Sequence, residues 1–533
     1  MLLDAGANCS LPDLFGWTAR DHVAFRGFWR IAELLEPPSV SENPPRSPKL
    51  PLTATNGMTS CVTGENRLFI NLGTLDTRMP KSVLDMGPYL SRYPACSFPE
   101  TGFSMEVDAI GAIGMSRTVQ LPQLHDATYE PFFFTTRDYR NLQIVFKVYK
   151  NCTKSGGGLE HIGTAIALLD SLKGGLESVR ENLVRYYTVP LIDKESMDFI
   201  GTVTFNFLLI KPCRSPGLST SMTQNVFGRS AVTRVVGHRD VQLTRDHVPV
   251  IYHDFLVSES GADLAPHNLS FDQFMYISEL QGSRQSHLAV MEDTITKRSN
   301  IPIKQRGRSR SRSLNTLVEE NKYRNLINGM RHTFEYRRKG FKGNLRGEHI
   351  HSSFTTLEEL LRSIPEEVHI DIELKYPMLW EAQDWQMDLY GVELNLFVDV
   401  ILEKVSALAG NRAIVFTSFS PELCILASHK QQKYPVMFLN ESNLFPTGDV
   451  RASNLQEAVH FARRWGLPGV VMSSEPFVMS PMLVPFVHDA GLVCVSFGAL
   501  NDDPRNAKIQ AKAGLDAIIV DNVNLISKTL MSS

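Results

Sequence analysis

Short, largely apolar stretches alternate with helical stretches through the second half of the chain. "VHIDIE" (368–373), "AIVFT" (413–417) and "PGVVM" (468–472) are typical of buried strands. Parallel strands need a crossover of about a dozen residues, usually a helix. The alternation therefore predicts a parallel α/β sheet or barrel. The expected strands are 249–252, 368–373, 413–417, 435–439, 468–472, 492–496 and 516–520, and the expected helices are 391–409, 420–431, 453–465, 480–490 and 503–513.

Residues 65–213 carry a different pattern. "NLQIVFKVYK" (141–150) alternates apolar and polar residues, and "FSMEVDAIG", "PFFFTT" and "GTVTFNFLLI" give further strand signals. Strands this close together, with few helices between them, predict a β-sandwich that is C2-like in character. Because no acidic cluster of the calcium-loop kind is present, we expect a structural or docking role in preference to lipid binding.

The first 36 residues resemble an ankyrin repeat. "LLDAGA" is followed in the right order by "GWTARDHVAFRG", although Ala19, Arg20 and Asp21 replace the Pro-Leu-His of the usual motif. The resemblance implies a partial repeat at 1–36 that contacts protein partners, and a plain amphipathic helix pair is the alternative. Residues 37–64 are rich in Pro, Ser, Thr and Asn, a composition that predicts a disordered linker.

The overall composition narrows the class of protein. The 533 residues allow roughly three domains, and the net charge of −3 gives no reason to expect nucleic acid or an anionic membrane as a partner. No apolar run approaches the roughly 18 residues of a membrane span. The seven cysteines are scattered and form no C-x-x-C, which predicts a reduced, cytoplasmic protein.

An insertion interrupts the α/β part at about 280–350. It includes "RGRSRSRS" (306–313), a charged low-complexity run. We expect this run to be a disordered loop, and a phosphorylation site or nucleic-acid contact is the weaker interpretation.

Several ordered motifs in the α/β part carry a family resemblance. "VVGHR" precedes "DVQLTRDHVPVIYHD" (240–254), and "HIDIELKYP", "FTSFSPELC" and "GLDAIIVDNV" follow. Together they resemble the glycerophosphodiester phosphodiesterase domain over roughly 234–526. With the ankyrin-like start, the chain is most similar to the fungal-type glycerophosphocholine phosphodiesterases. The resemblance implies a (β/α)8 TIM-type barrel at 230–530 that acts on a small-molecule glycerophosphodiester.

The resemblance also implies roles for individual residues. His238 and His253 match the two histidines that transfer protons, a task suited to a side chain with a pKa near neutrality. Arg239 and Lys375 match the cations that hold the substrate phosphate.

The resemblance implies a divalent metal ion, Mg²⁺ or Ca²⁺, held by carboxylate oxygens. Asp240 matches the Asp of a Glu-x-Asp pair, and Glu373 matches a Glu on the next strand. All these residues are expected at or just after strand C-terminal ends, where a barrel places its active site.

The junction of Arg239 with Asp240 departs from this pattern. A first and a second parallel strand need a crossover between them, and no residue separates "GHR" from "DVQLT". Either 235–244 is one continuous strand and the barrel is incomplete, or the first strand is displaced. Counting back from Asp240, His238 occupies the position of the family's first Glu. In a continuous strand His238 and Asp240 share one face, and Arg239 points to the other.

Two functions follow from this junction. The first is a metal-dependent phosphodiesterase that converts glycerophosphocholine to glycerol 3-phosphate and choline and is impaired in this chain. The second is a non-catalytic regulatory or binding protein of phosphate signalling with a degenerate barrel. A skipped coding segment, a splice product and a true pseudoenzyme all remain open as the origin of the junction.

Overall fold

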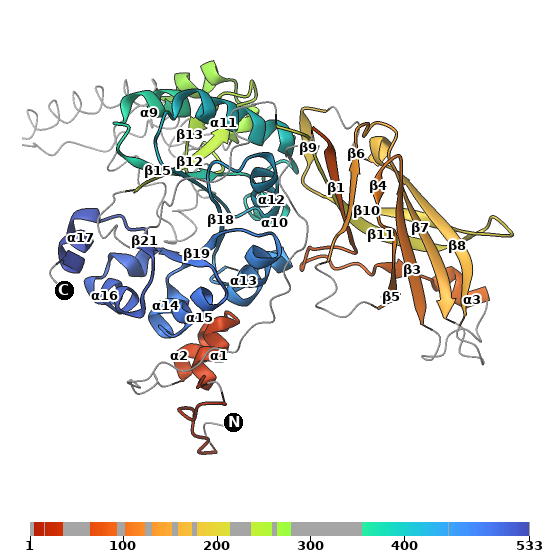
Figure 1. Cartoon of the computed structure of the whole chain (residues 1–533), viewed down its shortest axis with the longest axis horizontal. Helices are drawn as coiled ribbons and strands as arrows, with labels where there is room; N and C mark the ends of the chain where they lie inside the picture. The colour runs from red at the N-terminus through yellow and green to blue at the C-terminus, as the bar shows by residue number, and fades with distance from the viewer. Residues whose placement is uncertain are drawn as a thin grey trace, which may run out of the picture.

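The computed structural model describes residues 5–14, 16–35, 64–92, 102–122, 130–151, 158–172, 178–213, 236–257, 264–278, 354–445 and 447–531. A β-domain and an α/β domain lie side by side, and a helix pair near the N-terminus packs against the α/β domain (Figure 1). The predicted linker, apart from its last residue, and the predicted insertion at 280–350, including the 306–313 run, lie outside the described residues. No helix in the described part of the chain is long and apolar enough to cross a membrane.

The β-domain is one curled antiparallel sheet. Its path of hydrogen-bonded strands runs β4-β6-β1-β11-β10-β8-β7-β3-β5, and β2 pairs with β11. Strands far apart on this path share one apolar core, in which Leu68 and Phe205 join Met105 and Phe146. The strands are β1 (Asn66–Leu72), β2 (Leu84–Asp85), β3 (Phe103–Ile110), β4 (Ile113–Gly114), β5 (Arg117–Leu121), β6 (Phe132–Thr136), β7 (Gln143–Asn151), β8 (Leu159–Leu168), β10 (Tyr186–Asp193) and β11 (Phe199–Ile210), with short helices α3 (Gly87–Arg92) and α4 (Leu169–Leu172).

Strand β1 of this domain is buried on both faces. Leu68 and Ile70 point into the core of the β-domain, whereas Phe69 belongs to the core of the α/β domain. Alternation along a strand places neighbouring side chains on opposite faces, so one strand serves two cores. A short antiparallel pair, β9 (Arg180–Asn182) with β16 (Tyr390–Val392), adds backbone hydrogen bonds between the two domains.

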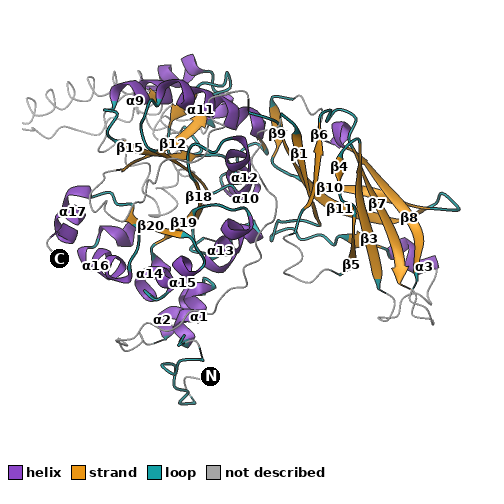
Figure 2. Ribbon diagram, viewed as in Figure 1, coloured by secondary structure: helices purple, strands orange, loops and turns teal. Residues whose placement is uncertain are grey.

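The α/β domain contains a nine-stranded sheet in the order β14-β13-β12-β15-β17-β18-β19-β20-β21. Figure 2 shows helices around the strands of this domain. The six strands from β15 onward are parallel and follow one another in chain order, which confirms the predicted alternation. These strands are β15 (His369–Leu374), β17 (Ile414–Ser418), β18 (Val436–Asn440), β19 (Gly469–Ser473), β20 (Val493–Phe497) and β21 (Ala517–Ile518).

Helices connect these strands. The five expected helices are found as α11 (Leu394–Leu408), α12 (Pro421–Lys430), α13 (Leu455–Arg464), α15 (Leu483–Asp489) and α16 (Pro504–Ala513). Side-chain caps mark several starts, as where Ser420 accepts from the backbone N–H of Leu423. The helices that were not predicted are α9 (Leu357–Ser363), α10 (Leu379–Asp384), α14 (Glu475–Met479) and α17 (Val523–Met531), with 3₁₀ turns at Pro266–Asn268, Val450–Ala452 and Ala499–Asp502.

Strand β12 (Val236–Leu243) runs without interruption through the junction of Arg239 with Asp240. It pairs in parallel with β15, so the first of the two predicted outcomes, a continuous strand, is the one observed. Within the described residues no ladder joins β21 to β12, so no strand pairing among them closes the sheet into a barrel.

One strand that was expected to be parallel is antiparallel. Residues 249–252 give β13 (Pro249–Ile251), which pairs antiparallel with β12 and with β14 (Thr355–Thr356). The physical reason is the tight turn at 244–248, where the backbone N–H of Thr244 donates to the carbonyl of Val248. A turn this short can only return the chain as a hairpin.

The N-terminal segment forms two short helices, α1 (Ala19–Phe25) and α2 (Trp29–Leu34). Asp21 closes a capping box with Thr18 and also accepts a hydrogen bond from Ser480 of the α/β domain. Phe486 packs edge-on against Trp17 and Phe25. The helix pair is thus docked onto the α/β domain, and its origin in an ankyrin repeat stays a prediction.

Candidate active site

Two neighbouring parallel strands bring the candidate residues together. In the β12–β15 register His238 lies opposite Asp371, and Asp240 lies opposite Glu373. Residues two positions apart share a face of a strand, so all four side chains lie on one face of the sheet. His238, Arg239 and Asp240 were expected at strand ends, but all three lie inside β12, which continues to Leu243.

His238 is held between two carboxylates. Its Nδ1 lies 2.8 Å from Oδ2 of Asp371, and its Nε2 lies 3.3 Å from Oε2 of Glu373. The second oxygen of Asp371 accepts a hydrogen bond of 2.8 Å from the hydroxyl of Thr417 on β17. Burial opposes the charged imidazole, but the charge and hydrogen bond of Asp371, with the hydrogen bond to Glu373, raise the pKa of His238 well above its ordinary value.

Lys375 follows β15 and points at the same two carboxylates. Its Nζ lies 3.1 Å from Oε1 of Glu373 and 3.4 Å from Oδ1 of Asp240. Burial would lower the pKa of Lys375, but these two charges outweigh it and raise the pKa. Burial likewise opposes ionisation of Asp240, and the charges of His253 and Lys375 still hold its pKa below the usual range.

His253 comes from the chain that follows β13. Its side chain is 47% exposed, and its Nδ1 lies 2.8 Å from Oδ1 of the buried Asp254. Burial lowers the pKa of His253 and the charge of Asp240 raises it, and the net direction is upward. Gln242 fixes this segment, because its side-chain amide donates to the carbonyls of Tyr252 and Asp254.

Arg239 lies apart from these groups. Its neighbours His238 and Asp240 share the site face, so alternation turns its side chain to the opposite face. There its Nη1 donates to the backbone carbonyl of His238. His238 and Arg239 do not point to one place, as the continuous strand predicted.

The site fits a divalent metal ion. His238, Asp240 and Glu373 each offer one ligand atom, and the three atoms lie within 4.8 Å of one another. Oδ1 of Asp240 and Oε1 of Glu373 are buried and make no hydrogen bond. Both oxygens form ion pairs with the ammonium of Lys375, and because buried polar atoms are normally hydrogen-bonded, this pair of acceptors indicates a place where a cation binds.

The sequence analysis missed three residues that build this site, namely Asp371, Thr417 and Gln242. Asp371 was part of a quoted motif, but its partner His238 is 133 positions away in the sequence. The parallel register of β12 on β15 was the only signal that could have paired them.

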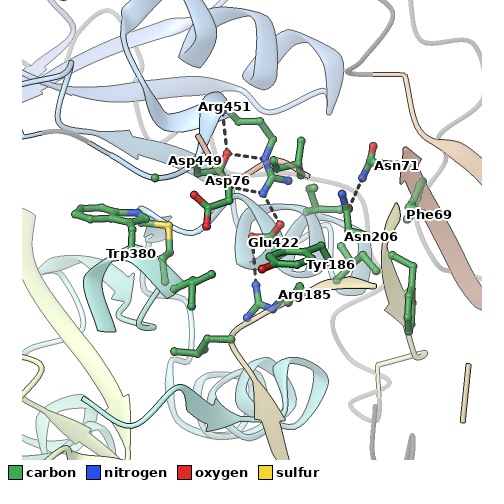
Figure 3. A pocket seen from close by; sticks show the side chains of 18 of the residues that line it. Phe69, Asn71, Asp76, Arg185, Tyr186, Asn206, Trp380, Glu422, Asp449 and Arg451 are labelled. Atoms are coloured by element: carbon green, nitrogen blue, oxygen red, sulfur yellow. Dashed lines mark hydrogen bonds and ion pairs between the residues drawn. The ribbon is translucent and has the colours of Figure 1, made fainter. Parts of the chain in front are cut away.

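A second feature is a cavity of about 90 Å³ between the two domains (Figure 3). Charged side chains from both domains meet there. Arg185 of the β-domain lies 3.4 Å from Oε2 of Glu422 on α12, and Arg451 pairs with Glu422 and with Asp449. Each arginine is paired with a carboxylate at the contact between the β-domain and the α/β domain, which we call the domain joint. We therefore assign the cavity to the packing of the two domains against each other.

Comparisons with known proteins agree with this architecture. Residues 239–525 match the model of the glycerophosphoryl diester phosphodiesterase family, and residues 63–214 match the GDE1-like C2 domain. The chain belongs to the glycerophosphoryl diester phosphodiesterase family. Its β-domain is C2-like, and the family match begins at the junction residue Arg239.

Curated relatives include two fungal enzymes named glycerophosphocholine phosphodiesterase GDE1. The protein of Candida albicans is 37% identical over 408 residues, which cover 69% of this chain and 34% of that protein. The protein of Eremothecium gossypii is 34% identical over 422 residues, which cover 69% and 31%. The chain thus spans about a third of the length of these relatives.

Solved structures show a more distant likeness. A glycerophosphodiester phosphodiesterase from Parabacteroides distasonis is 14% identical, with a TM-score of 0.33, and the match covers 60% of this chain and 93% of that one.

Proposed function

We propose that this chain is a metal-dependent glycerophosphodiester phosphodiesterase with severely reduced turnover, whose substrate is glycerophosphocholine. Family membership supports the reaction class, and the names of the fungal relatives support the substrate. One observation carries the reduced turnover. His238 is bound between Asp371 and Glu373 in the middle of a continuous strand, with Arg239 on the opposite face.

In this proposal His253 is the remaining proton-transfer group. Its ring is half exposed and its Nδ1 is fixed by Asp254, so its other nitrogen can serve a bound substrate. It would accept the proton of an attacking hydroxyl or water, or donate one to the leaving choline oxygen. The ammonium of Lys375 would hold the phosphate.

Asp240 and Glu373 would hold the metal, and Mg²⁺ or Ca²⁺ is the ion that the family resemblance implies. When bound, such an ion supplies positive charge to phosphoryl oxygens. The group of His238, Asp240 and Glu373 does not reproduce the family arrangement, because His238 takes the place of a carboxylate and the neighbouring Arg239 is turned away.

The test is choline release from glycerophosphocholine by the purified chain, with Mg²⁺ or Ca²⁺. The comparators are the His253→Ala variant and a chain in which the family's β/α segment is restored between Arg239 and Asp240. We expect the unmodified chain to release choline at nearly the same rate as the His253→Ala variant. The restored chain should exceed it by about 10²–10⁴, the usual contribution of one proton-transfer group. Robust activity of the unmodified chain that depends on His253 would refute the reduced turnover.

The second candidate is a non-catalytic binding protein of phosphate signalling. It is favoured by Lys375, whose ammonium already lies against Asp240 and Glu373 as an internal cation. If the restored chain binds glycerophosphocholine in calorimetry but releases no choline, this candidate replaces the first.

We also propose that the helix pair is part of an ankyrin-type repeat that contacts other protein. Ile31 and Leu34 on α2 are 49% and 72% exposed, and repeats of this kind pack such apolar side chains against their neighbours. Fusing a consensus ankyrin array ahead of α1 should raise the Tm of the chain. An array that unfolds independently would contradict the proposal.

We place the chain in the cytoplasm, a reducing compartment. Cys424 and Cys494 are buried and free, and burial raises the pKa of each thiol. Thiol titration of the denatured protein taken from cells under alkylating conditions should find all seven cysteines of the sequence reduced.

A further inference from the structure

The ligand set at the β12–β15 site differs in kind from a carboxylate cage. It combines one imidazole nitrogen, from His238, with carboxylate oxygens of Asp240 and Glu373. Mg²⁺ and Ca²⁺ are hard cations that prefer oxygen ligands. Imidazole suits Zn²⁺ and other late first-row dications, whose sites often have three protein ligands and an open position.

The surroundings of His238 are those of a metal ligand. A histidine that binds a metal through one ring nitrogen usually donates the other N–H to a carboxylate. Here Nδ1 of His238 lies against Asp371, and Asp371 is itself anchored by Thr417. This arrangement leaves Nε2 facing the carboxylate of Glu373 at 3.3 Å.

The two carboxylates supply an independent observation. Asp240 is 8% exposed and Glu373 is 3% exposed, and each has one oxygen without a hydrogen bond. Both oxygens face the ammonium of Lys375, which is the only cation besides His238 that the structure places beside both carboxylates among the described residues. A metal ion would have to displace that ammonium, so Lys375 is its competitor.

We propose that His238, Asp240 and Glu373 form a site that prefers a late transition-metal dication, Zn²⁺ or Co²⁺, over Mg²⁺ and Ca²⁺, and that Lys375 weakens binding by competition. The proposal rests on the metal site of the proposed function but not on turnover. The preference follows from the substitution of an imidazole for a carboxylate at position 238.

Visible absorption of Co²⁺ and calorimetry of Zn²⁺, Mg²⁺ and Ca²⁺ binding test the proposal directly. The full chain should bind one Co²⁺ at this site with ligand-field bands that Zn²⁺ abolishes. The His238→Glu variant should lose at least about 10-fold in Zn²⁺ affinity and gain affinity for Ca²⁺, because the all-oxygen set suits the harder ion. Lys375→Met should bind both classes of ion more tightly.

Two control variants separate loss of this site from general effects of removing a histidine. His488→Ala removes an imidazole that pairs with Asp516 outside the site, and it should leave Co²⁺ binding unchanged. His238→Gln removes the imidazole without adding charge, so it replaces His238→Glu if that variant does not fold.

Equal Zn²⁺ affinity in the full chain and in the His238 variants would overturn the proposal. So would a full chain that binds Mg²⁺ as tightly as Zn²⁺. Co²⁺ binding by the full chain keeps the site even if the chain with the restored β/α segment releases no choline, a result that counts against the proposed function alone. Choline release by the restored chain without Co²⁺ binding by the full chain would keep the proposed function and reject this site.

Discussion

Two buried lysines, Lys430 and Lys375, show how differently this chain treats its domain joint and its candidate active site. The side chain of Lys430 is 0% exposed, and its Nζ donates to Oδ1 of Asp399 and to the carbonyl of Lys211 in the β-domain, at 2.9 and 2.8 Å. Lys375 is 11% exposed and approaches Asp240 and Glu373, yet one oxygen of each carboxylate is without a hydrogen bond.

The domain joint and the candidate active site differ in how completely their buried charged groups are hydrogen-bonded. At the joint, the buried ammonium of Lys430 donates hydrogen bonds to a group from each domain. At the site, the carboxylates retain unused ligand capacity, because one ammonium cannot satisfy two buried carboxylates. Unused capacity in a buried cluster is typical of a place where a ligand completes the set.

The largest effect is expected at the joint. Lys430→Met should lower the free energy of unfolding by about 3–5 kcal/mol, because it removes one partner of a buried ion pair. Urea denaturation measures this loss. Added Zn²⁺ or Ca²⁺ should not restore the stability, since Lys430 and Asp399 lie outside the group of described residues whose ligand atoms are close enough to share a metal ion. An Asp399→Asn, Lys430→Met double variant that recovers part of the loss would sharpen the assignment to this pair.

Lys375→Met should produce a smaller and reversible effect. The variant leaves two buried carboxylates without their ammonium and is expected to lose about 3 kcal/mol or less in metal-free buffer. A metal ion that binds the folded chain adds stability, about 2.7 kcal/mol at 100 times its dissociation constant. Thermal unfolding with and without Zn²⁺ measures the recovery. If Zn²⁺ restores the Lys430→Met and Lys375→Met variants equally, the joint and the site do not differ in the way proposed.

Much of the fold could be predicted from the sequence, because the signals were local. The order of the strands from β15 to β21 followed from the alternation of apolar strands and helices. At the Arg239–Asp240 junction the absence of residues for a crossover allowed two outcomes, and the continuous strand is one of them. The direction of β13 did not follow, because "VPVIY" alternates in the same way in a parallel and in an antiparallel strand.

The site was predictable only in part. His238, Asp240 and Glu373 came from the family resemblance, and the structure brings them close to one another and to Lys375, whereas their roles stay predictions. The contact of Asp371 with His238 depends on strand register across 133 positions, which no local pattern records. The β9–β16 pair was missed for the same reason, since two strands of three residues from different domains carry no periodic signal.

The docking of the two domains should weaken in acid. His429 on α12 accepts from Nη1 of Arg67 at 2.7 Å and contacts Phe69 of the β-domain, and burial followed by the charge of Arg67 lowers its pKa to about 3. Between about pH 6.5 and 3 the unfolded chain binds this proton and the folded chain does not. Stability should therefore fall with decreasing pH by up to about 1.4 kcal/mol per pH unit.

The His429→Gln variant is the control for this acid sensitivity. It keeps an acceptor for Arg67 but cannot take up the proton. Urea denaturation at pH 7, 6 and 5 should show a steeper loss for the unmodified chain than for the variant. Parallel curves for the two proteins would mean that other groups control the acid response of the joint.

A third lysine gives the smallest effect and sets the baseline for the other two. Lys147 on β7 donates to Oε1 of Glu106 on β3 at 3.0 Å, with side chains that are 39% and 22% exposed. Water screens a pair of this kind, so Lys147→Met should change the free energy of unfolding by only about 0–1 kcal/mol. The tyrosine hydroxyl of Tyr149 still donates to Glu106 in the variant, which limits the loss further.

Raising the salt concentration should erase what difference remains, whereas the loss in Lys430→Met should persist, because a buried pair is screened much less than an exposed one. Urea denaturation of both variants at low and high salt makes the measurement, and a salt-resistant loss at Lys147 as large as that at Lys430 would show that burial is not what separates these lysines.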